Sequence, residues 1–286
     1  VGREAQYAPY EFKDLDANFA GCDMWLAQQI ADSLGVELEV VDMSFDGIIP
    51  AVKSGQVDIG IAAFTKTPER AEEIDFSDLY ETSAQLLVVK TGNADVYSTK
   101  EALAGQKVGA QKGTIQSQLI QSALPDSELF ELEKYPALAL EVQNGNIAGL
   151  VVDQAVGESL IATSNGGLEV ANFEFTAEEA SFGKAAVIAK GNEDLVAAVN
   201  EVINKVTAEA NKAKREEFWA NVEVGKQYKG VVKSLTSYGA FVDVGGVDGL
   251  CHISELSWNN IKHPSEVVKV GDEIEVYVKS YDPENQ

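Results

Sequence analysis

Residues 57–80, with the sequence VDIGIAAFTKTPERAEEIDFSDLY, decide how we interpret most of this chain. The stretch begins with apolar residues at alternate positions, Val57, Ile59 and Ile61, and this alternation predicts a buried strand. It continues into residues 67–70, TPER, where a capping hydroxyl, a proline and an acid predict the first turn of a helix. A helix N-terminus beside hydroxyls and an arginine can bind a carboxylate. From spacing alone, an ordinary strand–helix joint with a solvent-exposed arginine is an equally good interpretation.

The composition of the chain restricts the classes of protein to consider. Its 286 residues are enough for two or three compact units, and 45% hydrophobic residues are typical of a globular α/β protein. A net charge of −24 excludes broad electrostatic binding to nucleic acid or anionic lipid, although a local basic face remains open. No apolar run approaches the roughly 20 residues that span a bilayer. The two cysteines, Cys22 and Cys251, exclude a disulfide framework, and we expect both as buried thiols.

Strands and helices alternate along the chain, which predicts an α/β fold with a parallel sheet over residues 1–90. A second cycle begins at Lys107, so two lobes joined by extended crossings near 86–90 and 183–190 are the simplest architecture. Ligands bind such sheets at the carboxyl ends of the strands. Those ends are residues 4–10, 43–46 and 62–66, with Tyr10 and Phe12 expected in the core. The other expected strands are 36–43, 107–111, 133–135, 148–153 and 182–190, and the expected helices are 21–34, 48–54, 115–123, 136–144, 154–164 and 193 to about 210.

Several motifs resemble, in order and spacing, the extracytoplasmic amino-acid-binding proteins of ABC transporters. They are EAQYAPYEF, AGCDMWLAQQIADSLGV, FDGIIPAVKSGQVDIGIAAFTKTPERAEEIDFSDLYE, VGAQKGT and AGLVVD, and the resemblance covers about residues 1–207. It implies a two-lobed clamp of type II that closes on one amino acid, with residues 1–86 and 187–207 in the first lobe and 87–186 in the second. It also implies a monomer that serves an ABC transporter permease in the periplasm or, lipid-anchored, on the cell surface. No cofactor and no metal site are expected.

The resemblance assigns a carboxylate site to four residues. Arg70 would hold the ligand α-carboxylate as a bidentate fork, which a lysine could not imitate. Thr65, the backbone at Ala63, and Thr114 with its N–H at a helix start would complete the site. The family usually has a glycine near Ala63, so the sequence departs mildly from the pattern there.

Other residues would hold the rest of the ligand. Asp153, at the end of a strand in the other lobe, would bind the α-ammonium, and Phe45 and Tyr7 would sandwich the side chain. Specificity would lie in Glu4 and Gln111. Glu4 favours a cationic side chain such as that of arginine or lysine, and glutamine or another neutral polar residue is the alternative. Alternatively, Glu4 is an acid of the loop that only forms hydrogen bonds within the protein.

We expect no enzymatic activity from the lobes. Both histidines lie in the last part of the chain, His252 being the first, so Ser–His, Cys–His and histidine–metal chemistry are excluded upstream. A lyase that uses a carboxylate, Glu4 or Asp153, is the remaining catalytic alternative, because some acid-dependent dehydratases resemble the same clamp. The arginine, aspartate and aromatic set is complete for recognition without an acid–base pair, which favours binding.

The character of the sequence changes after Thr207. Residues 208–221 form a charged helical segment, which we interpret as a linker. The following segment, from 222 onward, is rich in valine, aromatic residues and glycine turns, which predicts a small antiparallel barrel. Its expected strands are 227–235, 240–244, 249–253 and 273–279.

This segment resembles the S-one domain, an OB-fold RNA-binding repeat of a bacterial ribosomal protein, over about residues 222–286. The matching stretches are VGKQYKGVVKS, YGAFVDVGGVDGLCHIS and KHPSEVVKVGDEIEVYV. The resemblance implies that Tyr238, Phe241 and His252 stack on single-stranded RNA and that Lys233 contacts phosphate. The structural alternatives are a packed strand histidine for His252 and barrel core for Phe241.

The two halves of the chain point to different compartments, because the clamp family works outside the membrane and the RNA-binding repeat works in the cytoplasm. The last segment is acidic, with six lysines against ten acids over 223–286, and it ends where its family continues into a fifth strand. The chain also begins at Val1, directly in what looks like a strand, and we expect a trimmed or fused chimera. An RNA-binding protein that carries the clamp as a passenger is therefore an alternative function.

Overall fold

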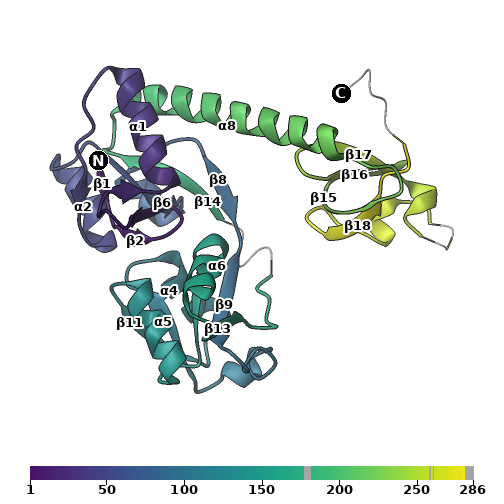
Figure 1. Cartoon of the computed structure of the whole chain (residues 1–286), viewed down its shortest axis with the longest axis horizontal. Helices are drawn as coiled ribbons and strands as arrows, with labels where there is room; N and C mark the ends of the chain where they lie inside the picture. Colours follow the sequence, from purple (N-terminus) through teal and green to yellow (C-terminus); the bar gives the residue numbers. More distant parts are fainter. Residues whose placement is uncertain (177–181, 258, 260, 281–286) are drawn as a thin grey trace. The chain divides into compact units, whose positions relative to one another are not determined.

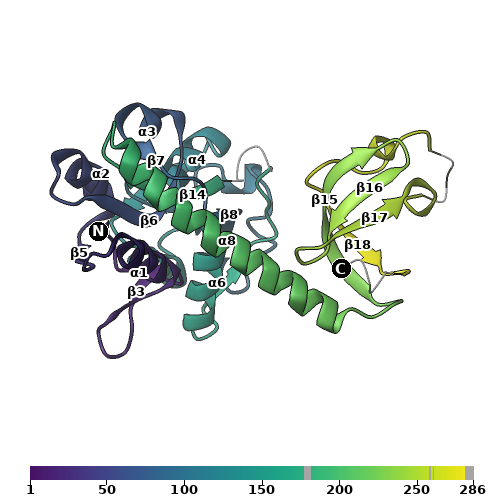
Figure 2. The same cartoon turned by 90° about the horizontal axis from the view of Figure 1, so that it is seen from above.

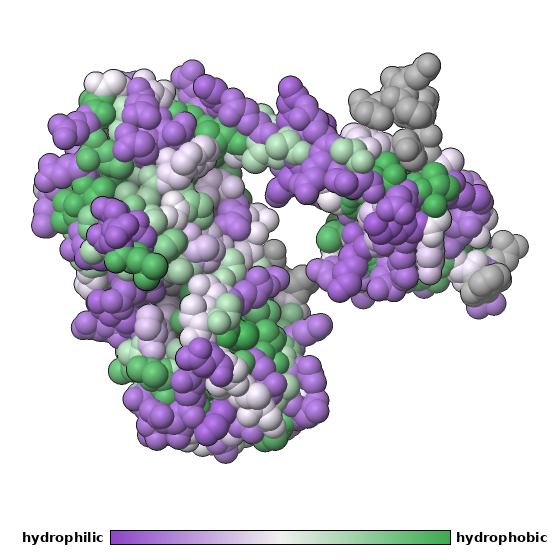
Figure 3. All heavy atoms as spheres, viewed as in Figure 1, coloured by the Kyte–Doolittle hydropathy of each residue, from purple (hydrophilic) through white to green (hydrophobic). Residues whose placement is uncertain are grey.

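The computed structural model describes residues 1–176, 182–257, 259 and 261–280. The chain forms two compact units, Val1–Asn204 and Lys205–Gln286, and each is described by itself (Figure 1). Hydrophilic side chains, interrupted by smaller apolar patches, are spread over the visible face of each unit in Figure 3, as the net charge of −24 requires. Within the described residues, no helix has the length and apolar character that a membrane span needs.

The first lobe of the first unit is built on a mixed sheet with the strand order β5-β1-β6-β14-β7, and β8 pairs with the outer part of β14. Strand β1 is parallel to β5 and β6, whereas β14 returns antiparallel to β6 and β8. The sheet is therefore not purely parallel, which corrects the expectation from the alternating pattern. The strands are β1 (Gly2–Arg3), β5 (Val41–Asp42), β6 (Ile59–Thr65), β7 (Asp75–Phe76), β8 (Glu81–Ser83) and β14 (Phe182–Ile188). A small second sheet holds β2 (Gln6–Tyr7), β3 (Glu11–Lys13) and β4 (Phe19–Ala20), and the helices are α1 (Cys22–Leu34), α2 (Phe45–Ser54), α3 (Pro68–Glu73) and the beginning of α8 (Glu193–Asn221).

The second lobe has a five-stranded sheet in the order β11-β10-β12-β9-β13. Strands β10, β11 and β12 are parallel, and β9 runs antiparallel between β12 and β13. The helices of this lobe follow the parallel strands, so their N-termini lie at the carboxyl ends of those strands. The elements are β9 (Gln85–Lys90), β10 (Lys107–Gln111), α4 (Ile115–Ala123), β11 (Glu128–Leu132), α5 (Tyr135–Asn144), β12 (Gly149–Asp153), α6 (Gln154–Thr163) and β13 (Leu168–Val170), with a 3-10 turn at Glu101–Leu103.

Several element boundaries differ from those expected. The strand expected at 133–135 is wrong, because residues 128–132 pair with β10 instead. The strand expected at 36–43 shrinks to β5, since its partner β1 has only two residues to pair with. The boundary expected at 187 falls inside β14, which pairs along its length with strands of the first sheet. By contrast, Thr67 caps α3 as the TPER motif predicts.

Strand β6 lies at the centre of the first sheet and is buried on both faces, so its residues do not alternate between core and solvent. Gly60 is needed in this strand because its backbone lies against side chains from two directions. A Cβ atom at this position would lie 2.6 Å from Cγ2 of Val187 and 2.7 Å from Cγ2 of Ile48. Both neighbours belong to the apolar core of the lobe.

The second unit contains a curled four-stranded antiparallel sheet in the order β17-β16-β15-β18 (Figure 2). Its core consists of Val232, Ala240, Val242 and Val244, on which Phe218 of α8 packs. Residues 208–221 are therefore more than a linker, because the end of α8 forms part of this unit's core. The open edge expected after the fourth strand concerns the chain beyond residue 280, outside the described residues. The strands are β15 (Gln227–Thr236), β16 (Gly239–Asp243), β17 (Asp248–His252) and β18 (Glu273–Tyr277).

The two cysteines are not buried, which corrects the expectation from composition. Cys22 is the first residue of α1 and is exposed, and Cys251 lies on the outer strand β17 and is half-buried. Both positions are at the margin of their element, where packing covers only one side of the residue.

We expect Gly60→Ala to lower the free energy of unfolding by about 1–3 kcal/mol, because the added methyl group overpacks the core between Val187 and Ile48. Gly249→Ala is the matched control, since its nearest new neighbour would be the carbonyl oxygen of Val242 at 3.7 Å. Thermal or chemical denaturation of the three proteins measures the effect. Equal stability of Gly60→Ala and the wild type would show that the sheet can move apart at this point.

Candidate functional site

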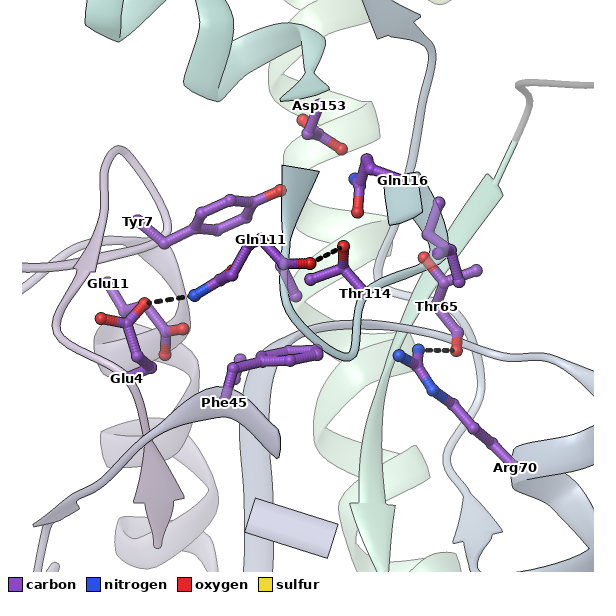
Figure 4. Close-up of a pocket in the computed structure, with 13 residues that line it drawn as sticks. Glu4, Tyr7, Glu11, Phe45, Thr65, Arg70, Gln111, Thr114, Gln116 and Asp153 are labelled. Carbon is purple, nitrogen blue, oxygen red and sulfur yellow. Dashed lines mark hydrogen bonds between the residues drawn. The ribbon is translucent and has the colours of Figure 1, made fainter. Parts of the chain in front are cut away.

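A pocket lies between the two lobes of the first unit (Figure 4). All nine residues expected from sequence to contact an amino acid line this pocket, although they come from both lobes. Sequence reasoning missed four other lining residues, which are Glu11, Ala62, Ile115 and Gln116. The nine expected residues are Glu4, Tyr7, Phe45, Ala63, Thr65, Arg70, Gln111, Thr114 and Asp153.

Arg70 points into one side of the pocket from the first turn of α3 (Figure 4). Its Nη1 donates to the carbonyl oxygen of Thr65 at 2.8 Å, and its Nη2 donates to the carbonyl oxygen of Gly113 at 3.1 Å. Burial lowers the pKa of Arg70 to about 10, so the guanidinium remains charged at neutral pH. Both bonds go to neutral carbonyls, and the neighbouring Glu69 is fully exposed, so within the described residues no buried acid pairs with the guanidinium. Arg70 can therefore attract a ligand carboxylate.

The backbone at Ala63 is engaged by a residue that sequence reasoning did not single out. Ala63 has φ of 47°, in the left-handed region that suits glycine better, as the family pattern at this position implies. Its N–H donates to Oδ2 of Asp23 at 2.8 Å, and the hydroxyl of Tyr80 donates to the same oxygen at 3.1 Å. The N–H of Ala63 is therefore not free to complete a carboxylate site, which corrects that part of the expectation.

Asp23 is buried in α1, and this burial raises its pKa to about 7. The hydrogen bonds from Ala63 and Tyr80 favour the charged form but do not offset the loss of solvent. An acid between Cys22 and Met24, on a helix whose neighbouring residues are apolar, is the signal that could have identified it.

Thr114 and Gln111 hold the second lobe's side of the pocket. The hydroxyl of Thr114 donates to the carbonyl oxygen of Gln111 at 2.6 Å and caps α4 by accepting from the N–H of Ser117. The amide of Gln111 donates to the carbonyl oxygen of Glu133 at 2.8 Å and lies 3.4 Å from Oε2 of Glu4. Gln111 therefore joins the two lobes at the bottom of the pocket.

Glu4 and Glu11 form an acidic wall opposite Arg70 (Figure 4). Both are buried, and within the described residues Oε1 of Glu4 and Oε2 of Glu11 have no hydrogen-bond partner. Burial raises the pKa of Glu4, and it raises the pKa of Glu11 well above its usual value. Arg3 lies behind them, but its guanidinium stacks on the Phe19 ring at 3.7 Å and makes no hydrogen bond in the described part of the chain. The wall thus has acceptor atoms available for a donor that enters the pocket.

Asp153 carries more contacts than the sequence suggested. Its Oδ2 lies 2.6 Å from Nζ of Lys184, and its Oδ1 accepts from the hydroxyl of Tyr10 at 3.2 Å and from the N–H of Ala155 at 3.3 Å. Tyr10 is buried, as expected, but it also touches the acid of the site. A lysine in the otherwise apolar run FGKAAVIAK is the signal that could have revealed Lys184.

The aromatic residues of the pocket are held by other rings. Tyr7 packs on Tyr135 and Tyr10 with ring centroids 5.4 and 5.8 Å apart, and Phe45 stacks on Phe64 at 4.7 Å. In the view of Figure 4 the rings of Tyr7 and Phe45 lie above and below the Gln111 amide. We propose below that the two rings enclose the side chain of a ligand.

In the second unit, the residues expected to bind RNA fall on the outside of the sheet. Phe241 lies between Ala240 and Val242, which are buried, so its side chain points away from the core. Its ring centroid is 6.5 Å from that of Tyr238, which is 49% exposed. The placement argues against the core interpretation of Phe241.

The other two expected RNA contacts are also exposed. His252 pairs with Gly239 across β16 and β17, beside Tyr238, and its Nδ1 lies 2.9 Å from the hydroxyl of Ser254. Lys233 lies at a bulge in β15 and forms an ion pair of 3.3 Å with Asp243. The lysine charge is therefore partly compensated, which lowers its value for a phosphate contact.

Comparison with known proteins gives the first unit a family. The sequence profile of the bacterial extracellular solute-binding proteins, family 3, matches residues 1–222. The chain is 29% identical over 226 residues to the L-cystine-binding protein of Escherichia coli strain K12, covering 79% of this chain and 84% of that one. A crystal structure of an amino acid ABC transporter substrate-binding protein from Streptococcus pneumoniae, bound to L-arginine, has a TM-score of 0.71 at 32% identity and covers 78% of this chain and 95% of that one.

The second unit matches a different family. Residues 221–286 match the profile of the S1 RNA binding domain. Over 74 residues the chain is 58% identical to the small ribosomal subunit protein bS1 of Pseudomonas aeruginosa, which covers 26% of this chain but only 13% of that protein. Both resemblances drawn from the sequence, and the fold class that they imply, are thereby confirmed.

We expect the stability of the wild type to fall relative to that of Asp23→Asn as the pH rises from about 4 to about 8. The folded protein holds a proton on Asp23 up to a pKa of about 7, whereas the unfolded chain releases it near the usual value of 3.8. Ionisation of the buried acid therefore costs free energy of folding, by about 1 kcal/mol or more over this interval. Asparagine keeps an acceptor for the N–H of Ala63 and does not titrate.

Thermal denaturation of both proteins at a series of pH values measures this difference. Asp16→Asn, at an exposed position, is the control and should follow the wild-type profile. Parallel profiles for the wild type and Asp23→Asn would contradict the raised pKa of Asp23.

Proposed function

The chain belongs to the bacterial extracellular solute-binding proteins of family 3, and on that premise we propose that its clamp captures a cationic amino acid, arginine or lysine. One observation carries the proposal. The pocket between the lobes has an uncompensated guanidinium, Arg70, on one side and two buried acids with free oxygens, Glu4 and Glu11, on the opposite side (Figure 4). A ligand with a carboxylate at one end and a cation at the other complements both sides.

The proposed ligand contacts follow from this polarity. The α-carboxylate would receive the two N–H groups of the Arg70 fork, with Thr65 and the start of α4 at Thr114 beside it. The α-ammonium would approach Asp153 and the carbonyl oxygen of Ala63, whose N–H is already engaged. The aliphatic part of the side chain would pass between the rings of Tyr7 and Phe45, both of which line the pocket.

The acids at the far end favour a cationic side chain over a neutral one. Burial raises the pKa of Glu4 and, more strongly, that of Glu11, although the nearby Arg3 guanidinium acts in the opposite direction. A guanidinium or ammonium group of the ligand would further stabilise their charged forms. Glutamine is the neutral alternative, because the amide of Gln111 and a protonated Glu4 could both bond its side chain. The arginine-bound neighbour from Streptococcus pneumoniae supports the cationic choice, and the cystine-binding relative shows that the family also accepts other amino acids.

The family also supports a site of action and a partner. Members are described as extracellular solute-binding proteins, and we propose that this clamp works outside the cytoplasm. It would deliver its amino acid as a monomer to the permease of an ABC importer, and it would do so by closing its lobes on the ligand.

We expect Arg70→Ala to weaken binding of L-arginine by about a hundredfold or more, because the ligand carboxylate would be buried without its charged partner. Arg70→Lys keeps the charge but loses the planar fork, so we expect an intermediate loss. Lys66→Ala, at an exposed position just before α3, should bind as the wild type does. Isothermal titration calorimetry measures the affinities, and circular dichroism checks the fold. If a folded Arg70→Ala variant bound L-arginine as tightly as the wild type, the assignment of Arg70 to the carboxylate site would be wrong.

A second function is supported by the second unit. The exposed Tyr238 and the half-buried Phe241 lie next to His252 on a domain of the S1 RNA-binding type, and this arrangement supports stacking on single-stranded RNA. The acidic surroundings and the Lys233–Asp243 ion pair argue for weak binding that depends on the bases more than on phosphate. RNA contact would then be an activity of this unit alone.

We expect Phe241→Ala to weaken binding of a short single-stranded RNA by about fivefold or more, in line with the loss of one stacked base. Tyr277→Ala, which removes an exposed ring from the opposite edge strand β18, should leave binding unchanged. Fluorescence anisotropy measures the RNA affinity of both variants. Repeating it at roughly 50 and 200 mM salt gives the electrostatic contribution to the binding free energy. An equal effect of the two substitutions would contradict the stacking face.

A further inference from the structure

The most buried ion pair of the first unit lies at the site proposed for the ligand ammonium. Nζ of Lys184 is 2.6 Å from Oδ2 of Asp153, and each side chain is only 3% exposed. Lys184 lies on β14 of the first lobe and Asp153 ends β12 of the second, so the pair joins the two lobes. The Lys184 ammonium thus occupies the position beside Asp153 that is proposed for the ligand α-ammonium.

Three donors already contact the Asp153 carboxylate, which has about four acceptor positions in all, so little capacity is left for a second cation. Its other oxygen already accepts from the hydroxyl of Tyr10 and from the N–H of Ala155. If a ligand α-ammonium reached Asp153 while Lys184 stayed in place, two positive charges would share one buried carboxylate. Like charges in a buried site repel strongly, so one of the two must leave.

A second acid lies within reach of the lysine. Oε2 of Glu81 is 3.8 Å from Nζ of Lys184, and Glu81 is directly opposite Lys184 in the register of β8 and β14. The Glu81 side chain is 41% exposed, so an ion pair there needs less desolvation than the pair with Asp153. Nζ also lies over the Tyr10 ring, 4.6 Å from its centroid, and this ring can stabilise the charge in either position. A change of side-chain rotamer would therefore transfer the lysine without moving the strand.

We propose that Lys184 competes with the ligand α-ammonium for Asp153, and that ligand binding transfers Lys184 to Glu81. The proposal rests on the amino-acid-binding function of the clamp. It makes Lys184 a specificity residue, because the competition lowers the advantage that an α-amino group gives a ligand. In the absence of a ligand, Lys184 would take the place of the ligand α-ammonium at Asp153 and so hold the two lobes together.

The test compares two ligands that differ only in the contested group. L-arginine carries the α-ammonium, and δ-guanidinovaleric acid is the same molecule without it. Isothermal titration calorimetry gives the ratio of their dissociation constants for the wild type and for Lys184→Met, which has a side chain of similar length and no charge. We expect the substitution to strengthen binding of L-arginine by about tenfold or more and to leave binding of the analogue unchanged. The dissociation constant of the analogue divided by that of L-arginine then rises by the same factor.

Glu81→Gln provides a second variant that keeps the buried pair and so does not depend on the stability of Lys184→Met. It removes the acid that would receive the lysine, and we expect it to weaken L-arginine several-fold, again without affecting the analogue. Lys190→Met is the matched control, because Lys190 follows the same strand and forms an exposed ion pair with Asp75. Its ratio should equal that of the wild type.

The outcomes separate this proposal from the function on which it rests. If L-arginine binds but the ratio is the same in the wild type, Lys184→Met and Glu81→Gln, then Lys184 has only a structural role and the proposal is overturned. If neither the wild type nor any variant binds L-arginine, the cationic-ligand function fails, and the competition fails with it.

Discussion

A carboxylate that is removed from water requires a counter-charge, and the arrangement of charges between the two lobes follows from this constraint. Asp153 satisfies it with Lys184, across the boundary between the lobes. Glu4 and Glu11 satisfy it only in part, because the nearby Arg3 guanidinium favours their charged forms but burial still raises their pKa values. Arg70 is the opposite case, a half-buried cation whose hydrogen bonds in the described part of the chain go to carbonyl groups. A zwitterion with a cationic side chain would supply both missing charges, which is why the pocket is best understood as a site for such a ligand.

The two sheets place these charges opposite one another. The pocket collects residues that follow β1, β6, β10 and β12, so strand ends from both lobes face the same space. Strand β14 returns through the first sheet and carries Lys184 to Asp153, and Gln111 reaches Glu4 from the other lobe. Within β6, Ala63 has a left-handed conformation, and its N–H donates to the Asp23 carboxylate. The bonds that would position the proposed ligand are therefore also the bonds that join the two lobes.

Local sequence signals predicted those features of the fold that depend on neighbouring residues. Thr67 and the proline after it predicted the start of α3, because capping acts within a few residues. The nine pocket residues followed from family motifs rather than from periodicity. Contacts between distant segments were not predictable in the same way: Asp23 bonds Ala63 across 40 residues, and Lys184 meets Asp153 across 31. Strand β11 was missed because its position depends on pairing with β10, which no local pattern specifies.

Calorimetric titration of L-arginine at neutral pH in two buffers of different ionisation enthalpy tests most directly that the buried acids receive a cation. Burial raises the pKa values of Glu4 and Glu11, and a ligand guanidinium beside them would lower these pKa values, so we expect binding to be coupled to proton release and to strengthen as the pH rises. We expect the apparent enthalpy to differ between the buffers by the heat of taking up those protons. Binding without proton release, or no binding of L-arginine at all, would contradict the cationic site.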